Sequence, residues 1–245
     1  MKALAFASRN SKEILRDPLN LAFGLGFPLA LLFLLSAIQS NIPVSLFDLK
    51  NLTPGLAVFG LSFISLFSGT LIAKDKGASF LMRLFASPLS AFDFIAGYTL
   101  PLLPMAIAQS VITFIVAFFL GLSININILL ALVVLIPSAI LFIAIGLLAG
   151  SILNDKQVGG ICGALLTNLC AWLSGTWFDL NLVGGTFKTV AEALPFVHAV
   201  NATKAAVAGN YASIMPELYW VIIYALVVFV LATIAFKSKM RNEEN

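Results

Sequence analysis

Few residues in this chain could perform covalent chemistry. Ser174 and Gly175 stand together near the end of an apolar run, and the single histidine, His198, follows further along. A serine becomes a nucleophile only when a base lies within hydrogen-bond reach. A membrane-embedded serine protease would use Gly-x-Ser-Gly, but Trp172 occupies the first glycine position, and His198 precedes the last apolar run instead of lying within it. We therefore interpret Ser174 as a small residue at a helix end and His198 as a polar group at the membrane surface.

The sequence also lacks the residue patterns of a disulfide, a metal site and a nucleotide-binding loop. Cys162 and Cys170 are eight positions apart, about 12 Å along a helix, which is too far for a disulfide. His198 has no Cys or His companion for a metal site. There is no Gly-x-x-x-x-Gly-Lys-[Ser/Thr] motif for ATP. We expect no catalytic residue, no metal site and no cofactor in this chain.

The composition predicts that the segments carrying these residues are embedded in a lipid membrane. The 245 residues are 60% hydrophobic and only 10% charged, whereas soluble domains carry about 25% charged residues. A bilayer core is crossed by about 20 apolar residues in a helix. Six runs of this kind are expected to span, at 19–38, 54–73, 98–120, 128–151, 158–177 and 218–236. We predict an all-α polytopic membrane protein with one transmembrane domain over 1–245.

The basic residues indicate the orientation of these spans. Of the 14 Lys and Arg, the side opposite the chain termini would hold only Lys50, Lys188 and Lys204. Cytoplasmic loops carry the excess of Lys and Arg. Both termini are therefore expected in the cytoplasm of a plasma-membrane protein, and the net charge of +3 does not indicate nucleic-acid binding. No span carries a charge at its centre, which disfavours an ion-coupled pump, although carbonyl and hydroxyl groups could still coordinate sodium.

Residues 1–17 are predicted to form an amphipathic helix in the cytoplasmic headgroup layer. The apolar face would contain Ala3, Leu4, Ala7, Ile14 and Leu15. The polar face would contain Lys2, Arg9, Lys12, Glu13 and Arg16, with Asp17 following and Phe6 at the polar edge. Pro18 would end the helix and turn the chain into the first span. A simple anchoring role is the alternative.

Two connections are unusually apolar. The outer connection, 178–217, would be costly to expose to water, so we expect a re-entrant segment of one or two short helices broken at Pro195. It would form an outer gate or cap that contains Pro195, Phe196 and His198. The second connection, 74–90, is charged and then apolar. Such a loop is expected to dock on a soluble cytoplasmic partner, or else to lie on the membrane.

Glycines recur in several spans, among them Gly60, Gly69, Gly146 and Gly150. Small residues allow helices to approach closely. They predict either ordinary packing within one subunit or a contact between subunits.

Three motifs, in their order along the chain, resemble the membrane subunit of type-2 ABC exporters. They are Glu13 to Pro18 (Glu-Ile-Leu-Arg-Asp-Pro), Arg83 to Ser90 (Arg-Leu-Phe-Ala-Ser-Pro-Leu-Ser), and the stretch from Ser174-Gly175-Thr176-Trp177-Phe178 to Ala193-Leu194-Pro195-Phe196-Val197-His198-Ala199. The resemblance covers essentially the whole chain. Lys74 to Ser79 depart from the Arg-Glu and Gly-Thr that this family often has there.

The resemblance implies that 74–90 contains a coupling helix that inserts into a groove of an ATPase subunit. Phe80, Leu81, Leu84 and Phe85 would form its apolar plug, and Arg83 and Asp75 would make charged contacts. Ser87 would also belong to the docking segment, and Pro88 would end the helix. It further implies two ATPase subunits that bind ATP and Mg, and a second permease subunit, identical or related. The cargo would be an apolar or amphipathic drug, antibiotic, peptide or lipid. Candidate lining residues are Phe side chains together with Thr167, Asn168, Trp172, Gln109 and Ser110. A secondary carrier without an ATPase and a non-transporting anchor are the alternatives.

Overall fold

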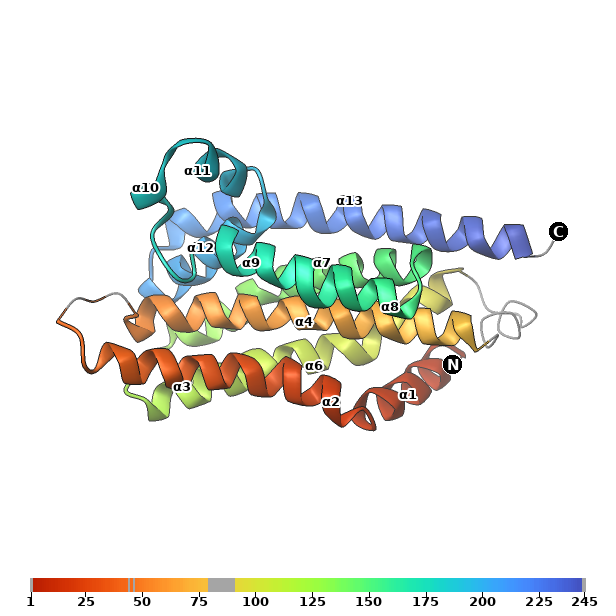
Figure 1. The fold of residues 1–245 in the computed structure, drawn as a ribbon, viewed down its shortest axis with the longest axis horizontal. Coiled ribbons are helices and arrows are strands. Elements are labelled where there is room, and N and C mark those ends of the chain that lie inside the picture. Colours follow the sequence, from red (N-terminus) through yellow and green to blue (C-terminus); the bar gives the residue numbers. More distant parts are fainter. Residues whose placement is uncertain (1, 44, 46, 79–90, 244–245) are drawn as a thin grey trace.

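The computed structural model describes residues 2–43, 45, 47–78 and 91–243, and these residues form a bundle of helices without a strand (Figure 1). The first half contains α1 (Lys2–Leu15), α2 (Pro18–Leu21), the π-helix η1 (Ala22–Gly26), α3 (Phe27–Gln39), α4 (Leu49–Gly77) and α6 (Ala91–Phe119). The second half contains α7 (Asn127–Ile152), α8 (Asp155–Val158), the π-helix η2 (Gly159–Leu166), α9 (Thr167–Leu173), α10 (Leu180–Val183), α11 (Gly185–Glu192), α12 (Pro195–Ala208) and α13 (Tyr211–Glu243). The prediction of an all-α fold is confirmed.

Five helical segments of the described chain are long and apolar enough to cross a membrane. They are Ala22–Gln39, Leu49–Gly77, Asp93–Phe119, Asn127–Ile152 and Tyr211–Ser238. Each coincides with one of the six apolar runs. The two termini lie at one end of the bundle, and α10 and α11 lie at the other (Figure 1). We call the latter the outer end.

The remaining run, 158–177, differs from its prediction. Its helix is continuous through α8, η2 and α9, but it begins with the polar Asp155 and Lys156 and is not among the five. It also ends early, at Leu173, because Gly175 adopts a left-handed backbone with φ +68°. Trp177 therefore lies beyond the helix, in the connection at the outer end.

The central helix is α4, which is buried over most of its length. It packs against α7 so closely that a Cβ atom on Gly146 would overlap the backbone oxygen of Ser65, and one on Gly150 would overlap that of Gly69. The hydroxyl of Ser68 donates to the Ile143 carbonyl at 2.9 Å across the same contact. These glycines serve packing within the subunit, the first of the two predicted roles.

We expect Gly146→Ala to destabilise the protein by about 1–3 kcal/mol, the usual cost of overpacking. The obstacle is backbone, so neither helix can relieve the overlap by changing a rotamer. The matched control is Gly26→Ala, because a Cβ there meets nothing within 4 Å. Thermal unfolding in detergent measures both variants, and equal melting temperatures would contradict the packing argument.

A lysine joins the same two helices at the end that carries the termini. Lys76, in the last turn of α4, donates to the carbonyl oxygens of Gly150 at 3.1 Å, Ser151 at 3.4 Å and Leu153 at 2.7 Å. These carbonyl oxygens lie at the C-terminal end of α7. Carbonyls at a helix C-terminus have no hydrogen-bond donor within the helix, and a positive charge there is favourable. α4 thus runs further than the predicted span, and Lys74, Asp75 and Lys76 belong to a helix and not to a loop.

The N-terminal helix α1 packs on the bundle with part of its predicted apolar face, since Ala7 and Ile14 are buried. Phe6, placed at the polar edge by the sequence, is 6% exposed, whereas Leu4 and Leu15 are 65% and 71% exposed. Phe6 packs edge-on against Tyr98, with ring centroids 4.9 Å apart, and a Cβ on Gly97 would overlap its ring. Only Phe6 departs from the predicted faces, because the prediction took lipid as the only partner of α1, while α6 covers one side of the helix. That Leu4 and Leu15 face lipid stays a prediction.

The 178–217 connection contains three helices. α12 begins at Pro195, as the sequence predicts for the break, and proline is well suited to this first helical position. α12 packs against α13, α7 and α4, and Phe196 stacks on Phe142 with a centroid distance of 5.9 Å. α10 and α11 lie over the outer end of the bundle (Figure 1).

Candidate functional site

An apolar groove of about 630 Å³ runs between α3, α4 and the η2–α9 helix. Aromatic side chains dominate it, and Thr167 and Asn168 are its polar members. Its lining consists of Phe23, Phe27, Leu31, Leu35, Phe47, Phe59, Phe63, Gly163, Thr167, Asn168, Ala171, Trp172 and Trp177. Pockets for small molecules are of this size and are mostly apolar with a few polar groups.

A track of aromatic rings follows the groove. Phe63 lies 5.9 Å from Phe27 and 5.6 Å from Phe59, measured between ring centroids, and Phe59 lies 5.7 Å from Trp177. These separations lie in the range of favourable aromatic pairs. The rings present a continuous apolar surface that leads toward the outer end.

The predicted lining residues divide into two groups. Thr167, Asn168 and Trp172 line the groove. Gln109 and Ser110 do not, because both are buried between helices, at 1% and 2% exposure. The Gln109 amide donates to Thr113 at 3.2 Å and lies against Gly60.

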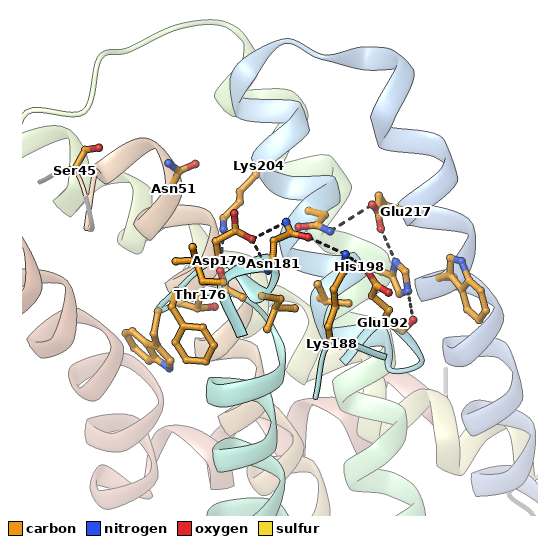
Figure 2. A pocket seen from close by; sticks show the side chains of 18 residues that line it. Ser45, Asn51, Thr176, Asp179, Asn181, Lys188, Glu192, His198, Lys204 and Glu217 are labelled. Atoms are coloured by element: carbon orange, nitrogen blue, oxygen red, sulfur yellow. Dashed lines mark hydrogen bonds and ion pairs between the residues drawn. The ribbon is translucent and has the colours of Figure 1, made fainter. Parts of the chain in front are cut away.

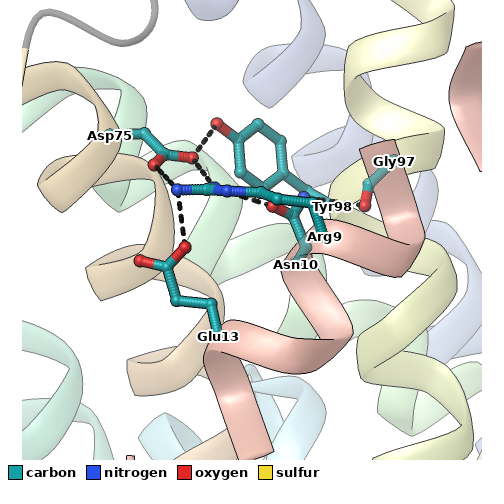
Figure 3. Close-up of polar contacts among 6 residues, drawn as sticks. All are labelled: Arg9, Asn10, Glu13, Asp75, Gly97 and Tyr98. Carbon is teal, nitrogen blue, oxygen red and sulfur yellow. Dashed lines mark hydrogen bonds and ion pairs between the residues drawn. The ribbon is translucent and has the colours of Figure 1, made fainter. Parts of the chain in front are cut away.

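A polar cluster joins α1, α4 and α6 at the end that carries the termini (Figure 3). Arg9 binds both carboxylate oxygens of Asp75, at 2.7 Å each, and Tyr98 donates to the same carboxylate at 2.8 Å. Glu13 pairs with Arg9 on α1 itself. Asn10, fully buried, donates to the Gly97 carbonyl at 3.0 Å. We call these residues the Arg9 cluster.

The Arg9 cluster changes the interpretation of Asp75. The family resemblance implied a charged contact with a docked ATPase, but Asp75 is 2% exposed and is bonded to Arg9 and Tyr98. This correction follows from α4 continuing past the predicted end of the span, which brings Asp75 beneath α1. The other predicted docking residues, Phe80, Leu81, Arg83, Leu84, Phe85, Ser87 and Pro88, lie outside the described residues.

The remaining residues of the N-terminal motif have simpler roles. Asp17 pairs with Lys74 at 3.2 Å, and Arg16 is exposed. Pro18 begins α2, two residues after α1 has ended, as expected of a proline that breaks a helix. Tyr98 and Asn10 were missed by sequence reasoning. No sequence signal marked Asn10, because it stands among the consecutive polar residues Ser8 to Glu13 of α1.

A second pocket, of about 680 Å³, lies at the outer end (Figure 2). We call it the outer pocket. Most of its lining residues are of polar or charged type. The lining consists of Ser45, Asn51, Gly175, Thr176, Trp177, Phe178, Asp179, Leu180, Asn181, Leu182, Lys188, Glu192, Val197, His198, Asn201, Lys204, Glu217 and Trp220.

His198 joins three helices at this pocket. Its Nδ1 lies 2.5 Å from a carboxylate oxygen of Glu217 on α13, and its Nε2 lies 2.9 Å from the Glu192 carbonyl oxygen at the end of α11. The ring stacks on Trp220 with a centroid distance of 5.2 Å. Burial alone would lower the pKa of His198, but the bonds to Glu217 and Glu192 outweigh it and raise the pKa above 6.5.

Ser174 does not face this histidine as a nucleophile would. Its hydroxyl is buried and bonds to the Thr176 hydroxyl at 2.7 Å. Both ring nitrogens of His198 bond to Glu217 and Glu192. Among the residues that the structure describes, no serine pairs with His198.

Comparison with known proteins gives one family. The family model described as ABC-2 type transporter matches residues 2–207. None of the curated proteins matches the chain.

Proposed function

Because the chain belongs to the ABC-2 type transporter family, and so is a multi-pass membrane permease of an ABC transporter, we propose that it exports an apolar or amphipathic substrate. The observation that carries this proposal is the apolar groove between α3, α4 and α9. Its aromatic walls, with Thr167 and Asn168 as isolated polar groups, suit a cargo that partitions into the bilayer.

We infer six spans, the sixth being the Asp155–Leu173 helix, and an α1 that lies in the headgroup layer. An even number of spans is consistent with termini at the same end of the bundle (Figure 1). The distribution of Lys and Arg favours the cytoplasm for that end. The α10–α12 segment would form the outer re-entrant connection.

Power would come from two separate ATPase subunits, which would bind ATP and Mg, while a second permease subunit would complete the path. The 80–88 segment would insert into an ATPase, and α4 would carry the displacement from there to the groove that it lines. The Arg9 cluster supports this route because it ties α1 to α4 just before that segment. Reversing a two-state population from 1:99 to 99:1 takes about 5.5 kcal/mol of differential binding.

At the outer end, Pro195, Phe196 and His198 would belong to a gate. α12, which carries all three, packs against three spans, and His198 bonds it to α11 and α13. Displacement of α12 would therefore open or close the outer end of the path.

Arg83→Glu tests the docking proposal. We expect it to abolish ATP-driven export from vesicles and to leave membrane insertion intact, because it reverses a charge at the proposed ATPase contact. The matched control is Lys156→Glu, an exposed cation on the same side of the membrane, which should export normally.

Normal export by Arg83→Glu would contradict docking at this segment. A secondary carrier, the second candidate, would export without co-purifying an ATPase subunit and would respond to an ion gradient and not to ATP.

A further inference from the structure

The apolar groove and the outer pocket meet at one residue. Trp177 belongs to the lining of both. The connection before α4 also reaches both, since Phe47 lines the groove and Ser45 lines the outer pocket. The two cavities therefore adjoin, and their combined lining is apolar along the spans and richer in polar residues at the outer end.

The charges of the outer pocket balance one another. Lys188 donates to Asn181 at 2.8 Å and pairs with Glu192 at 3.5 Å. Lys204 donates to the Gly175 carbonyl at 2.9 Å, and nearby Asp179 opposes the lowering of its pKa by burial. His198 pairs with Glu217. The acidic residues Asp179, Glu192 and Glu217 equal in number the lysines and the imidazolium of His198, so a ligand with a net charge would lose hydration here for little net attraction.

The same pocket is rich in groups that recognise uncharged polar ligands. Asn51, Asn181 and Asn201 carry amides, which both donate and accept hydrogen bonds. Trp177 and Trp220 add flat aromatic surfaces with a polar edge. Figure 2 shows the amide and charged side chains converging on the pocket from several helices and connections.

We propose that groove and outer pocket together hold one amphiphile, with its apolar chain against the aromatic track and a net-neutral, hydrogen-bonding headgroup in the outer pocket. This assignment of substrate class rests on the proposed export function and deepens it. Trp177 marks the boundary between chain and headgroup, the kind of position at which tryptophan is favoured in membranes. The pose is that of a molecule in the outer leaflet, so it corresponds to cargo about to leave.

Equilibrium binding to the purified chain in nanodiscs, without ATP or an ATPase, tests the assignment. The probes are fluorescent amphiphiles that share one acyl chain and carry a glucose, phosphocholine, phosphoglycerol or trimethylammonium headgroup. We expect the glucose or the phosphocholine probe to bind at least tenfold more tightly than the anionic and cationic probes. Those two arms distinguish a hydroxyl-rich headgroup from a zwitterionic one.

Two variants test the headgroup end and the apolar-chain end of the site separately. Asn51→Leu, at an exposed pocket position, should weaken the preferred probe at least fivefold and leave the matching fatty alcohol unchanged. Trp172→Ala, 56% exposed in the groove, should weaken every probe that carries the chain. Asn210→Leu and Phe119→Ala, exposed positions outside both cavities, are the controls and should change nothing.

Equal binding of all four headgroups, or tightest binding of a charged one, would overturn the inference. So would a headgroup preference that survives Asn51→Leu unchanged. The assay contains no ATPase, so its result is independent of whether ATP drives export. Loss of ATP-driven export with intact headgroup selection would overturn the proposed function alone.

Discussion

Asp75→Leu is expected to abolish ATP-driven export and to lower the free energy of unfolding by about 2 kcal/mol, less than the cost of breaking a fully buried ion pair because the Arg9 side chain is 35% exposed. The substitution removes the acceptor shared by Arg9 and Tyr98. Arg9 would then keep only Glu13 as a charged partner among the contacts of the Arg9 cluster, and α1 would lose its bidentate bond to α4. Thermal unfolding in detergent and transport into inverted vesicles measure the two effects.

The double variant Arg9→Met with Asp75→Leu separates stability from coupling. An apolar pair of similar size often replaces a buried ion pair at no net cost. We therefore expect the double variant to recover most of the stability and to remain defective in export. Full export by the double variant would contradict a coupling role for the pair. Equal instability of the single and double variants would contradict the pairing itself.

Lys74→Leu is the matched control for the Asp75 variants. It breaks a second pair between the N-terminal segment and α4, Asp17–Lys74, in which the lysine side chain is 47% exposed. Exposed pairs contribute about 0–1 kcal/mol. A loss of stability as large as that of Asp75→Leu would show that any contact of this segment matters and that burial of Asp75 does not.

Alkaline pH is expected to loosen α11 from α12 and α13 at the outer end. Both ring nitrogens of His198 face acceptors, Glu217 and the Glu192 carbonyl, so the imidazolium form satisfies both. The pKa of His198 is raised above 6.5. Its stabilising contribution is therefore complete below about pH 6.5 and is lost as pH rises through the raised pKa. Lys188 from α11 and Lys204 and Asn201 from α12 line the same pocket.

Trp220 fluorescence reports this titration, because the indole stacks on the His198 ring. In a Trp172→Phe, Trp177→Phe background we expect a transition with its midpoint above pH 6.5. The transition should vanish in His198→Gln. Glu217→Gln should move the midpoint down, since the charged partner is gone while the amide can still bond. A midpoint at or below pH 6.5 in the parent would contradict the predicted direction.

Local pattern predicted much of the helical framework, and packing decided the rest. Apolar length identified the runs that became the five candidate spans, and the backbone limits of proline correctly placed breaks at Pro18 and Pro195. The burial of Phe6 was not predictable from the periodicity of α1, because it depends on α6, which approaches α1 at Gly97 and packs against the Phe6 ring.

The sites were less accessible to sequence reasoning than the helices. Asp75 lies 66 positions from Arg9, and no local rule pairs them. Glu217 lies 19 positions from His198 and was counted as the end of the apolar outer connection. Thr167, Asn168 and Trp172 line the groove, and the sequence singled them out because polar and large aromatic groups stand out in an apolar run. Gln109 and Ser110 have the same polar character but are buried between helices.

α4 and α7 form one rigid helix pair, because Gly146 and Gly150 bring the two backbones into contact and Lys76 bonds α4 to the end of α7. Sliding one helix past the other would drive backbone atoms together. The η1–α3 and η2–α9 segments are less tightly packed. A Cβ on Gly26, Gly159 or Gly160 would meet no neighbour, and both segments contain a π-helical turn. If the groove widens, α3 and α9 must therefore move away from α4, while α4 and α7 keep their relative position.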